Sequence, residues 1–247
     1  MNRALEIYEK LKQLNVYDIS PRIHTKMPAF PSHPNCWILE GVRTRAEHGY
    51  NCNMLVVGEH MGAHIDAPMH TCSSPEALSI DMFPADYFVA PYKKYALDRY
   101  NPQPGEFIDV DKLKECESRD GFAIDEGDIV LLQYGYDKYY YAEVEGRLTN
   151  FYGSNAPGLT EAANQYLLDK KIRAIGADSS TCEIAAKDGK FINIDRSGHE
   201  IYYHPHNIPV MENFVNLSDA PTEGLFIALP WKIEGGTGCP VQVLLYG

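Results

Sequence analysis

Two short, largely apolar segments most constrain how this 247-residue chain can fold. One is the continuous run Ile129-Val130-Leu131-Leu132, and the other is residues 172–176, which is apolar apart from Arg173. Strands without polar alternation are typical of sheets that are buried on both faces, as in α/β proteins. The sequence therefore predicts a sheet whose central strands are covered on each side.

Other segments of the chain also fit a mixed α/β fold. Apolar residues recur at helical spacing over residues 2–14, which predicts an N-terminal helix, and Thr160 is a candidate N-cap for a helix that ends at Asp169. No repeat, low-complexity run or linker divides the sequence, so we expect one domain over residues 1–247. Further predicted elements are a helix at 110–118, apolar segments at 85–90 and 94–98, and strands at 16–20, 50–58 (with 54–57 as an apolar core), 208–217, 225–230 and 241–246.

The charge balance excludes several classes of partner. Lys and Arg total 22 and Asp and Glu total 34, so the net charge is -12. Binding to nucleic acid or to an anionic membrane surface requires a basic patch, so we expect neither partner. The six cysteines form no Cys-x-x-Cys pair, the start is a charged helix and not a signal peptide, and no apolar run is long enough to span a membrane. We therefore expect a cytoplasmic protein with reduced thiols.

The densest chemical signal lies in residues 60–70. His60, His64 and Asp66 fall in this short stretch, although the chain has only 9 histidines. Neutral imidazole and carboxylate groups suit Zn²⁺, Mn²⁺ or Fe²⁺. Gly62 permits a tight turn, and Asp66 follows His64 at strand spacing, so both side chains can point to the same side. We predict that these three residues bind one divalent metal and leave coordination positions open for water.

A fourth member of the stretch, His70, follows Pro68 and can approach the site from another direction. An unligated histidine beside an activated water can transfer protons near neutral pH, so we predict an acid/base role for His70. The alternative is that all of these histidines only cap turns or bond to the backbone, and their density disfavours it.

With these residues in view, the chain resembles the putative cyclase family, which includes bacterial-type kynurenine formamidases and isatin hydrolases. The family signature is His-x-Gly-Thr-His-x-Asp-x-Pro-x-His, and the chain departs from it at Ala63, where threonine is usual. The signature is matched at His60, Gly62, His64, Asp66, Pro68 and His70. Segments similar to the family's opening precede it at 17–20 and 27–31, and further similar segments follow it at 176–179, 212–217 and 228–241.

The resemblance implies a swivelling β/β/α fold and a homodimer or homotetramer. It implies a cofactor of one or two divalent ions, Zn²⁺ or Mn²⁺, with the first ion held by His60, His64 and Asp66. In two-metal relatives the aspartate bridges to a second ion that is held by a later histidine and a later glutamate.

Glu212 matches the later glutamate of those relatives, although it could instead pair with Lys232 or Arg196. For the later histidine we select His199, while His204 and His206 lie nearby.

The expected reaction is hydrolysis of a carbon–nitrogen amide bond in a small aromatic formamide or cyclic amide. Phe30 is the candidate substrate-binding residue, and the tyrosine-rich stretch 134–152 could add stacking. A lyase or cyclase on the same scaffold and a non-catalytic binding protein stay open, whereas a serine hydrolase is disfavoured because no Gly-x-Ser-x-Gly occurs.

Two further features have plain structural interpretations. Asp178, at a strand end, could simply cap a turn. The run Gly235-Gly236-Thr237-Gly238 lacks the Lys-Ser/Thr of a phosphate loop, so we interpret it as a turn.

Overall fold

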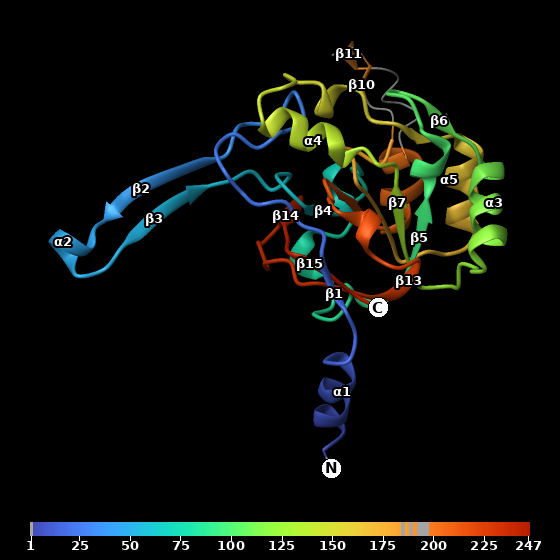
Figure 1. Ribbon diagram of the computed structural model, residues 1–247, viewed down its shortest axis with the longest axis horizontal. Helices are drawn as coiled ribbons and strands as arrows, with labels where there is room; N and C mark the ends of the chain where they lie inside the picture. The colour runs from blue at the N-terminus through green and yellow to red at the C-terminus, as the bar shows by residue number, and fades with distance from the viewer. Residues whose placement is uncertain (1, 184–185, 188–189, 192–197) are drawn as a thin grey trace.

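A large curled sheet organises the computed structural model, which describes residues 2–183, 186–187, 190–191 and 198–247. The strand order is β1-β15-β13-β5-β7-β9-β12-β4-β14 (Figure 1). The central strands β5, β7, β9 and β12 pair in parallel, and the outer strands pair antiparallel. This mixture confirms the expected α/β fold class. The strands are β1 (Val16–Asp18), β4 (His64–Asp66), β5 (Val89–Ala96), β7 (Ile129–Gln133), β9 (Ala174–Ala177), β12 (Val210–Glu212), β13 (Glu223–Ala228), β14 (Gly238–Pro240) and β15 (Val243–Tyr246).

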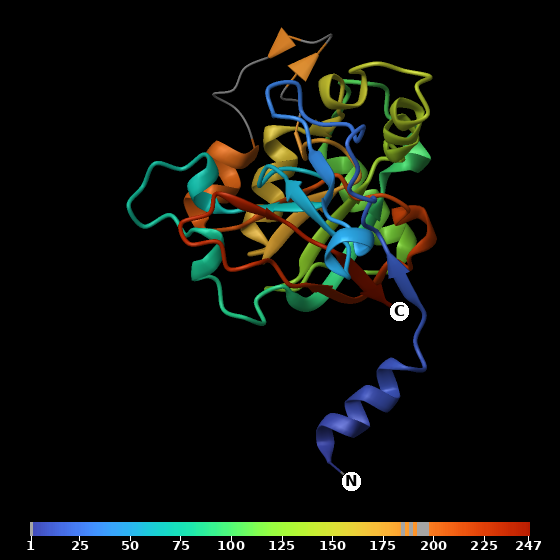
Figure 2. The same cartoon turned by 90° about the vertical axis from the view of Figure 1, so that its left-hand side faces the viewer.

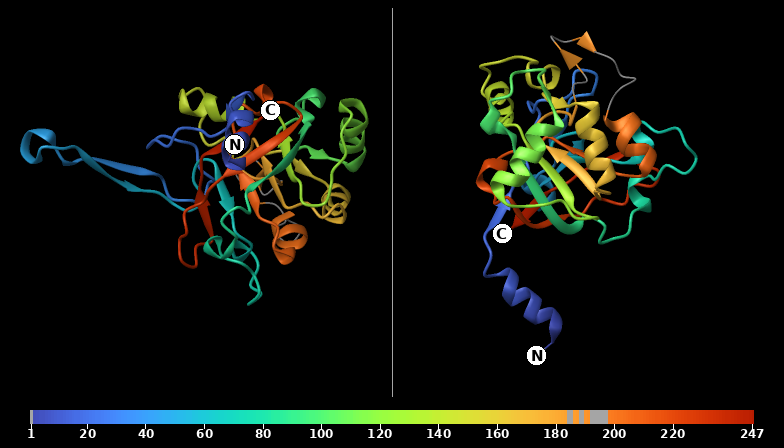
Figure 3. Two further views of the ribbon diagram at one scale, coloured as in Figure 1. Left: turned by 90° about the horizontal axis from the view of Figure 1, so that it is seen from below. Right: turned by 90° about the vertical axis from the view of Figure 1, so that its right-hand side faces the viewer.

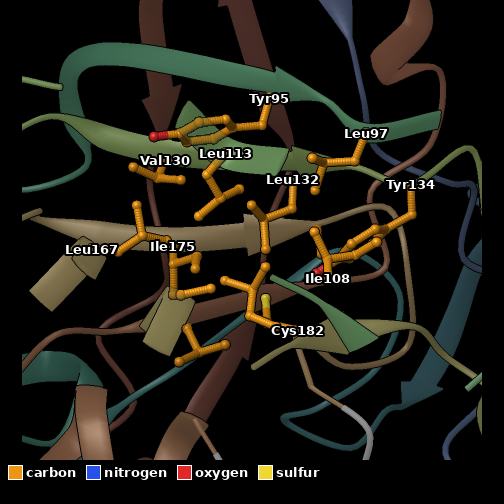
Figure 4. Packing of buried hydrophobic residues seen from close by; sticks show 14 of the residues in the cluster. Tyr95, Leu97, Ile108, Leu113, Val130, Leu132, Tyr134, Leu167, Ile175 and Cys182 are labelled. Atoms are coloured by element: carbon orange, nitrogen blue, oxygen red, sulfur yellow. The ribbon is translucent and has the colours of Figure 1, made fainter. Parts of the chain in front are cut away.

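The apolar run in β7 is buried on both faces, as predicted. Ile129 and Leu131 belong to a hydrophobic cluster on one face of the sheet, and Val130 and Leu132 belong to a second cluster on the other face. Helices α3 (Val110–Asp120) and α5 (Glu161–Asp169) pack on the second face (Figure 3, right). Figure 4 shows this packing, in which the α3 and α5 leucines lie against side chains of β7 and β9. Successive residues of β7 therefore point alternately into the two hydrophobic clusters.

The helix predicted after Thr160 and the predicted N-terminal helix are both present, but only the first packs against the sheet. Thr160 caps α5, because its hydroxyl accepts a hydrogen bond from the Ala163 amide at 3.3 Å, as expected. The N-terminal helix is also present as α1 (Arg3–Leu11), but it has no buried residue and projects away from the sheet (Figures 1 and 2). In the described part of the chain, no helix is both long enough and apolar enough to cross a membrane.

A two-stranded arm extends from the body of the protein (Figure 1). It consists of β2 (Trp37–Arg43) and β3 (Cys52–Val56), with the short helix α2 (Arg45–His48) at its tip. The strand predicted at 50–58 is confirmed as β3. The prediction that residues 54–57 form an apolar core is wrong, since Met54, Leu55 and Val56 are 50%, 44% and 50% exposed. The strand pairs with β2 and not with the large sheet, so the body of the protein does not cover its faces.

Several other boundaries differ from the predictions. The apolar segments at 85–90 and 94–98 are joined by the single strand β5, which accommodates Pro91 because its parallel pairing with β7 begins one residue later, at Tyr92. The strand predicted at 208–217 ends at Glu212, because Asn213 takes a left-handed φ of 61°. The sequence did not predict β2, α2, β14 or α4 (Asp137–Val144). It also did not predict the short pairs β6 (Phe107–Ile108) with β8 (Gly158–Leu159) and β10 (Ala186–Lys187) with β11 (Lys190–Phe191).

Candidate metal centre

Strand register brings three acidic and imidazole side chains to one place on the sheet. His64 and Asp66 are two residues apart in β4, so their side chains share a face. Glu212 in β12 pairs directly with His64 across the antiparallel ladder, which places its carboxylate on the same face. All three side chains are buried. The turn that leads into β4 depends on Gly62, whose φ is +62°.

Two more histidines complete the cluster from outside these strands. His60 Nδ1 lies 2.5 Å from Asp66 Oδ1. His199, in the π-helical turn η6 (Gly198–Tyr203), places Nε2 at 3.2 Å from Asp66 Oδ2 and 3.3 Å from Glu212 Oε1. The ligand atoms therefore form two groups that share Asp66, one with His60 and His64 and the other with His199 and Glu212.

The hydrogen bonds of the buried histidines fit a cation between them. His64 Nδ1 lies 2.8 Å from the Gly62 carbonyl oxygen, which can only accept, so Nδ1 carries the hydrogen and Nε2 presents a lone pair. That Nε2 has no hydrogen-bond partner among the described residues, yet it lies 3.1 Å from Asp66 Oδ1. His199 follows the same rule, because its Nδ1 lies 3.1 Å from Glu183 Oε1 and its Nε2 faces the two carboxylates. Ligating histidines commonly donate their other N–H to a carboxylate or a backbone carbonyl in this way.

The electrostatics of the cluster suit a bound cation. Burial lowers the pKa of His64, but Asp66 and Glu212 outweigh burial and raise that pKa to about 9. Burial opposes a charged Asp66 as well, yet the neighbouring histidines hold the pKa of Asp66 well below its usual value. Burial and the Asp66 charge raise the pKa of Glu212. Protons on the histidines balance the carboxylates, and a divalent ion would displace those protons on binding.

A cleft of about 100 Å³ opens beside this cluster. Its lining includes Phe30 and His70, so the structure places both of these predicted site residues next to the candidate ligands. The His70 ring lies 4.0 Å from that of His60, centroid to centroid. Burial, helped by the neighbouring histidines, lowers the pKa of His70 to about 4 despite the opposing effect of Asp66, so His70 is neutral at pH 7.

The structure also separates the three candidates for the later histidine. His199 joins the cluster, whereas His206 is exposed. His204 is fully buried, but its Nδ1 lies 2.6 Å from Thr71 Oγ1 and the residue belongs to neither ligand group. Glu212 contacts His64 and His199. Of its two suggested alternative partners, Lys232 is exposed and Arg196 lies outside the described residues.

Some residues near the site were not found from the sequence. Glu183 and Thr237 contact the outer nitrogens of His199 and His60, and His33 lines the cleft. Each of them reaches the cluster through contacts between distant parts of the chain, so no local spacing could reveal them. The tyrosine-rich stretch does not supply stacking residues in this cleft. Tyr134, Tyr136, Tyr140 and Tyr152 pack in the hydrophobic core instead, each at most 2% exposed.

Ala63, the one departure from the family signature, lies away from the cleft. Its side chain packs in the hydrophobic cluster that contains Ile65 and borders a groove on the outer side of the sheet. The absent threonine hydroxyl therefore leaves the candidate ligands in place.

Comparisons with known proteins agree with this geometry. A family model described as "Putative cyclase" matches residues 17–183. Isatin hydrolase from Roseibium aggregatum is 29% identical over 196 residues, which cover 78% of this chain and 73% of that protein. The crystal structure of an isatin hydrolase bound to the product analogue thioisatinate is similar with a TM-score of 0.83 at 24% identity, covering 99% of this chain and 97% of that chain. Isatin hydrolase A from Ralstonia solanacearum has a TM-score of 0.81 at 25% identity and covers 99% and 96% of the two chains.

The matched region contains the whole His60–His70 signature, and the likeness in fold extends over nearly the entire chain. The chain thus has the cyclase-family fold that the resemblance implied. Because the family model covers well over half of the sequence and the signature residues meet at one buried cluster, the chain belongs to the putative cyclase family.

Proposed function

We propose that this chain hydrolyses the carbon–nitrogen amide bond of a small aromatic formamide or cyclic amide. Family membership and the isatin hydrolase relative support a metal-dependent hydrolase. The observation that carries the proposal is the pair of ligand groups sharing Asp66, set beside a cleft that contains a neutral histidine. Isatin is itself a cyclic amide fused to an aromatic ring, which supports this substrate class.

The proposed cofactor is one or two Zn²⁺ or Mn²⁺ ions. His60, His64 and Asp66 would hold the first ion, and His199 and Glu212 would hold a second ion that shares Asp66. Imidazole nitrogens and carboxylate oxygens suit both metals, and three protein ligands leave room for water and substrate. When bound, such an ion supplies an acidic water and polarises the substrate carbonyl.

His70 and Phe30 have distinct parts in this proposal. Because His70 is neutral at pH 7, one of its ring nitrogens has a free lone pair, so the ring can accept a proton from the attacking water and return it to the departing nitrogen. Phe30, which also lines the cleft, would pack against the aromatic ring of the substrate.

We also infer a homodimer, with a second copy of this chain covering the arm. Trp37, Leu39 and Met54 on the arm are 58%, 47% and 50% exposed, and a two-stranded hairpin alone is marginally stable in water. Near the base of the arm lies a groove of about 590 Å³ that Leu229 and Trp231 help to line, each of them 63% exposed. A two-fold axis would let each arm cover apolar surface of the other copy.

The six cysteines form no disulfide, which supports a cytoplasmic protein.

The proposed reaction is tested by stripping the protein with a chelator and restoring Zn²⁺ or Mn²⁺. We expect the restored protein to open isatin-like lactams or cleave N-formyl arylamines, and we expect His64→Ala to retain neither metal nor turnover. A metal-loaded protein that turns over no amide but catalyses an elimination or ring closure would favour the lyase alternative. Metal binding without turnover of any substrate would favour a binding protein, and either result would contradict the proposal.

A further inference from the structure

The run Gly235-Gly236-Thr237-Gly238, which we interpreted from the sequence as a turn, contacts the candidate metal centre. Thr237 lies just before β14, and its carbonyl accepts a hydrogen bond from the Ala67 amide at 2.8 Å, directly after β4. Its hydroxyl oxygen lies 2.9 Å from His60 Nε2. On its other side, the same hydroxyl lies 2.5 Å from Glu59 Oε2. Glu59, Thr237 and His60 therefore form a continuous chain of side-chain contacts.

The direction of each hydrogen bond in this chain follows from the donor inventory. Glu59 Oε2 also accepts the backbone N–H of Thr237 at 3.1 Å, so this oxygen acts as an acceptor. The Thr237 hydroxyl must then donate its single hydrogen to Glu59, which leaves only lone pairs toward His60. His60 must in turn donate from Nε2. The hydrogen of a neutral His60 is therefore fixed on Nε2, and the lone pair is fixed on Nδ1.

The lone pair on His60 Nδ1 faces a lone pair of the Asp66 carboxylate. His60 Nδ1 lies 2.5 Å from the carboxylate oxygen Oδ1 of Asp66. Two acceptors at this separation repel unless a cation lies with them, either a proton or a metal ion. The contacts of Glu59 and Thr237 thus favour a cation on the Asp66 side of His60.

The close approach of this segment depends on the residue that follows Thr237. A Cβ atom at Gly238 would lie 2.7 Å from His60 Cε1 and 2.8 Å from the backbone oxygen of Ile65, both too short for a real contact. The absence of a side chain lets β14 pack directly against the His60 ring. Backbone pairing of Gly238 with Asp66 holds the segment in that position.

We propose that Glu59 and Thr237 are positioning residues that set the tautomer of His60, so that Nδ1 faces the metal. This inference rests on the proposed metal centre and goes beyond it, because neither residue belongs to a candidate ligand group or to the cleft lining described above. Hydrogen-bond partners of this kind orient a metal-binding histidine and increase its basicity, and their loss costs about 10–100-fold in metal affinity.

The test measures Zn²⁺ affinity by chelator competition on purified, metal-free protein. Thr237→Val removes the hydroxyl at nearly constant volume, and we expect about 10–100-fold weaker binding. Thr237→Ser restores the hydroxyl and should restore most of the affinity. Glu59→Gln keeps an acceptor but loses the charge, so we expect a smaller loss than for Thr237→Val. Glu234→Gln removes the same charge from an exposed position of the same loop and should leave affinity unchanged.

A second readout follows the hydrogen itself. Nuclear magnetic resonance of the zinc-loaded protein with ¹⁵N-labelled histidine should show the His60 hydrogen on Nε2. A hydrogen on Nδ1, or Thr237→Val binding Zn²⁺ as tightly as wild type, would overturn the inference while leaving the metal centre intact. A wild-type protein that binds no metal would overturn both this inference and the proposed function, so the two failures are distinguishable.

Discussion

Replacing His70 gives the sharpest test of how the site moves protons. His70 lies beside the ligand His60 but belongs to neither ligand group, so His70→Ala should keep the metal. Burial lowers the pKa of His70 to about 4, so the ring is neutral at pH 7 and one of its nitrogens is free to accept a proton. Loss of a general acid/base lowers kcat by about 10²–10⁴-fold, which equals about 3–5.5 kcal/mol in the activation barrier.

The assay measures metal content and kcat on the same folded sample of His70→Ala. We expect wild-type metal content, a kcat reduced by about 10²–10⁴-fold, and partial rescue by added imidazole, because the substitution vacates a ring-sized space in the cleft. His206→Ala removes an exposed histidine and should change neither quantity. Full metal with near-normal kcat would refute the proton-transfer role, and loss of the metal would show that His70 is a ligand.

Three further predictions concern stability and assembly. Asp178→Ala should lower the unfolding free energy by at least about 3 kcal/mol in denaturant titrations, because Asp178 accepts three backbone N–H groups and each unsatisfied donor costs about 1–3 kcal/mol; a change below about 1 kcal/mol would contradict this. Burial lowers the pKa of His204 to about 2, below its usual 6.5, so the unfolded chain binds the extra proton between these values and stability falls with acidity; from pH 7 to pH 5 wild type should lose about 2 kcal/mol more than His204→Asn, and equal losses would exclude a buried neutral His204. Light scattering should show a wild-type dimer that Trp37→Glu converts to monomer, whereas an active wild-type monomer at micromolar concentration would refute the arm-covered dimer.

Local sequence patterns predicted the centre of the fold well, because burial on both faces leaves a direct mark on β7. Val130 and Leu132 face one core and Ile129 and Leu131 face the other, which only a continuous apolar run can satisfy. The same reasoning was wrong for Met54 in the arm. An apolar strand is expected in a core, but this one pairs with β2 away from the large sheet, and pattern alone does not distinguish a core from a surface that awaits a partner.

The candidate site divides in the same way. His60, His64, Asp66 and His70 are close in sequence, so their spacing indicated a shared site before any fold was known. Thr237 lies 177 residues from His60, and only the pairing of β14 with β4 brings it to that ring.

The later ligands gave a weaker signal in the sequence. Glu212 and His199 were assigned by resemblance. The fold brings the carboxylate of Glu212 and the imidazole of His199 into one ligand group with Asp66. Asp178 was interpreted as a turn cap, and its bonds to Tyr134, Gly135 and Tyr136 confirm that role.

The most direct test of the metal centre is a crystal structure of the metal-loaded protein with anomalous scattering data. Diffraction recorded on either side of the zinc and manganese absorption edges locates each ion and identifies the element. We expect an anomalous peak between His60 Nδ1, His64 Nε2 and Asp66, and any second peak between Asp66, His199 and Glu212. A peak elsewhere, or none in protein that retains metal and activity, would contradict this expectation.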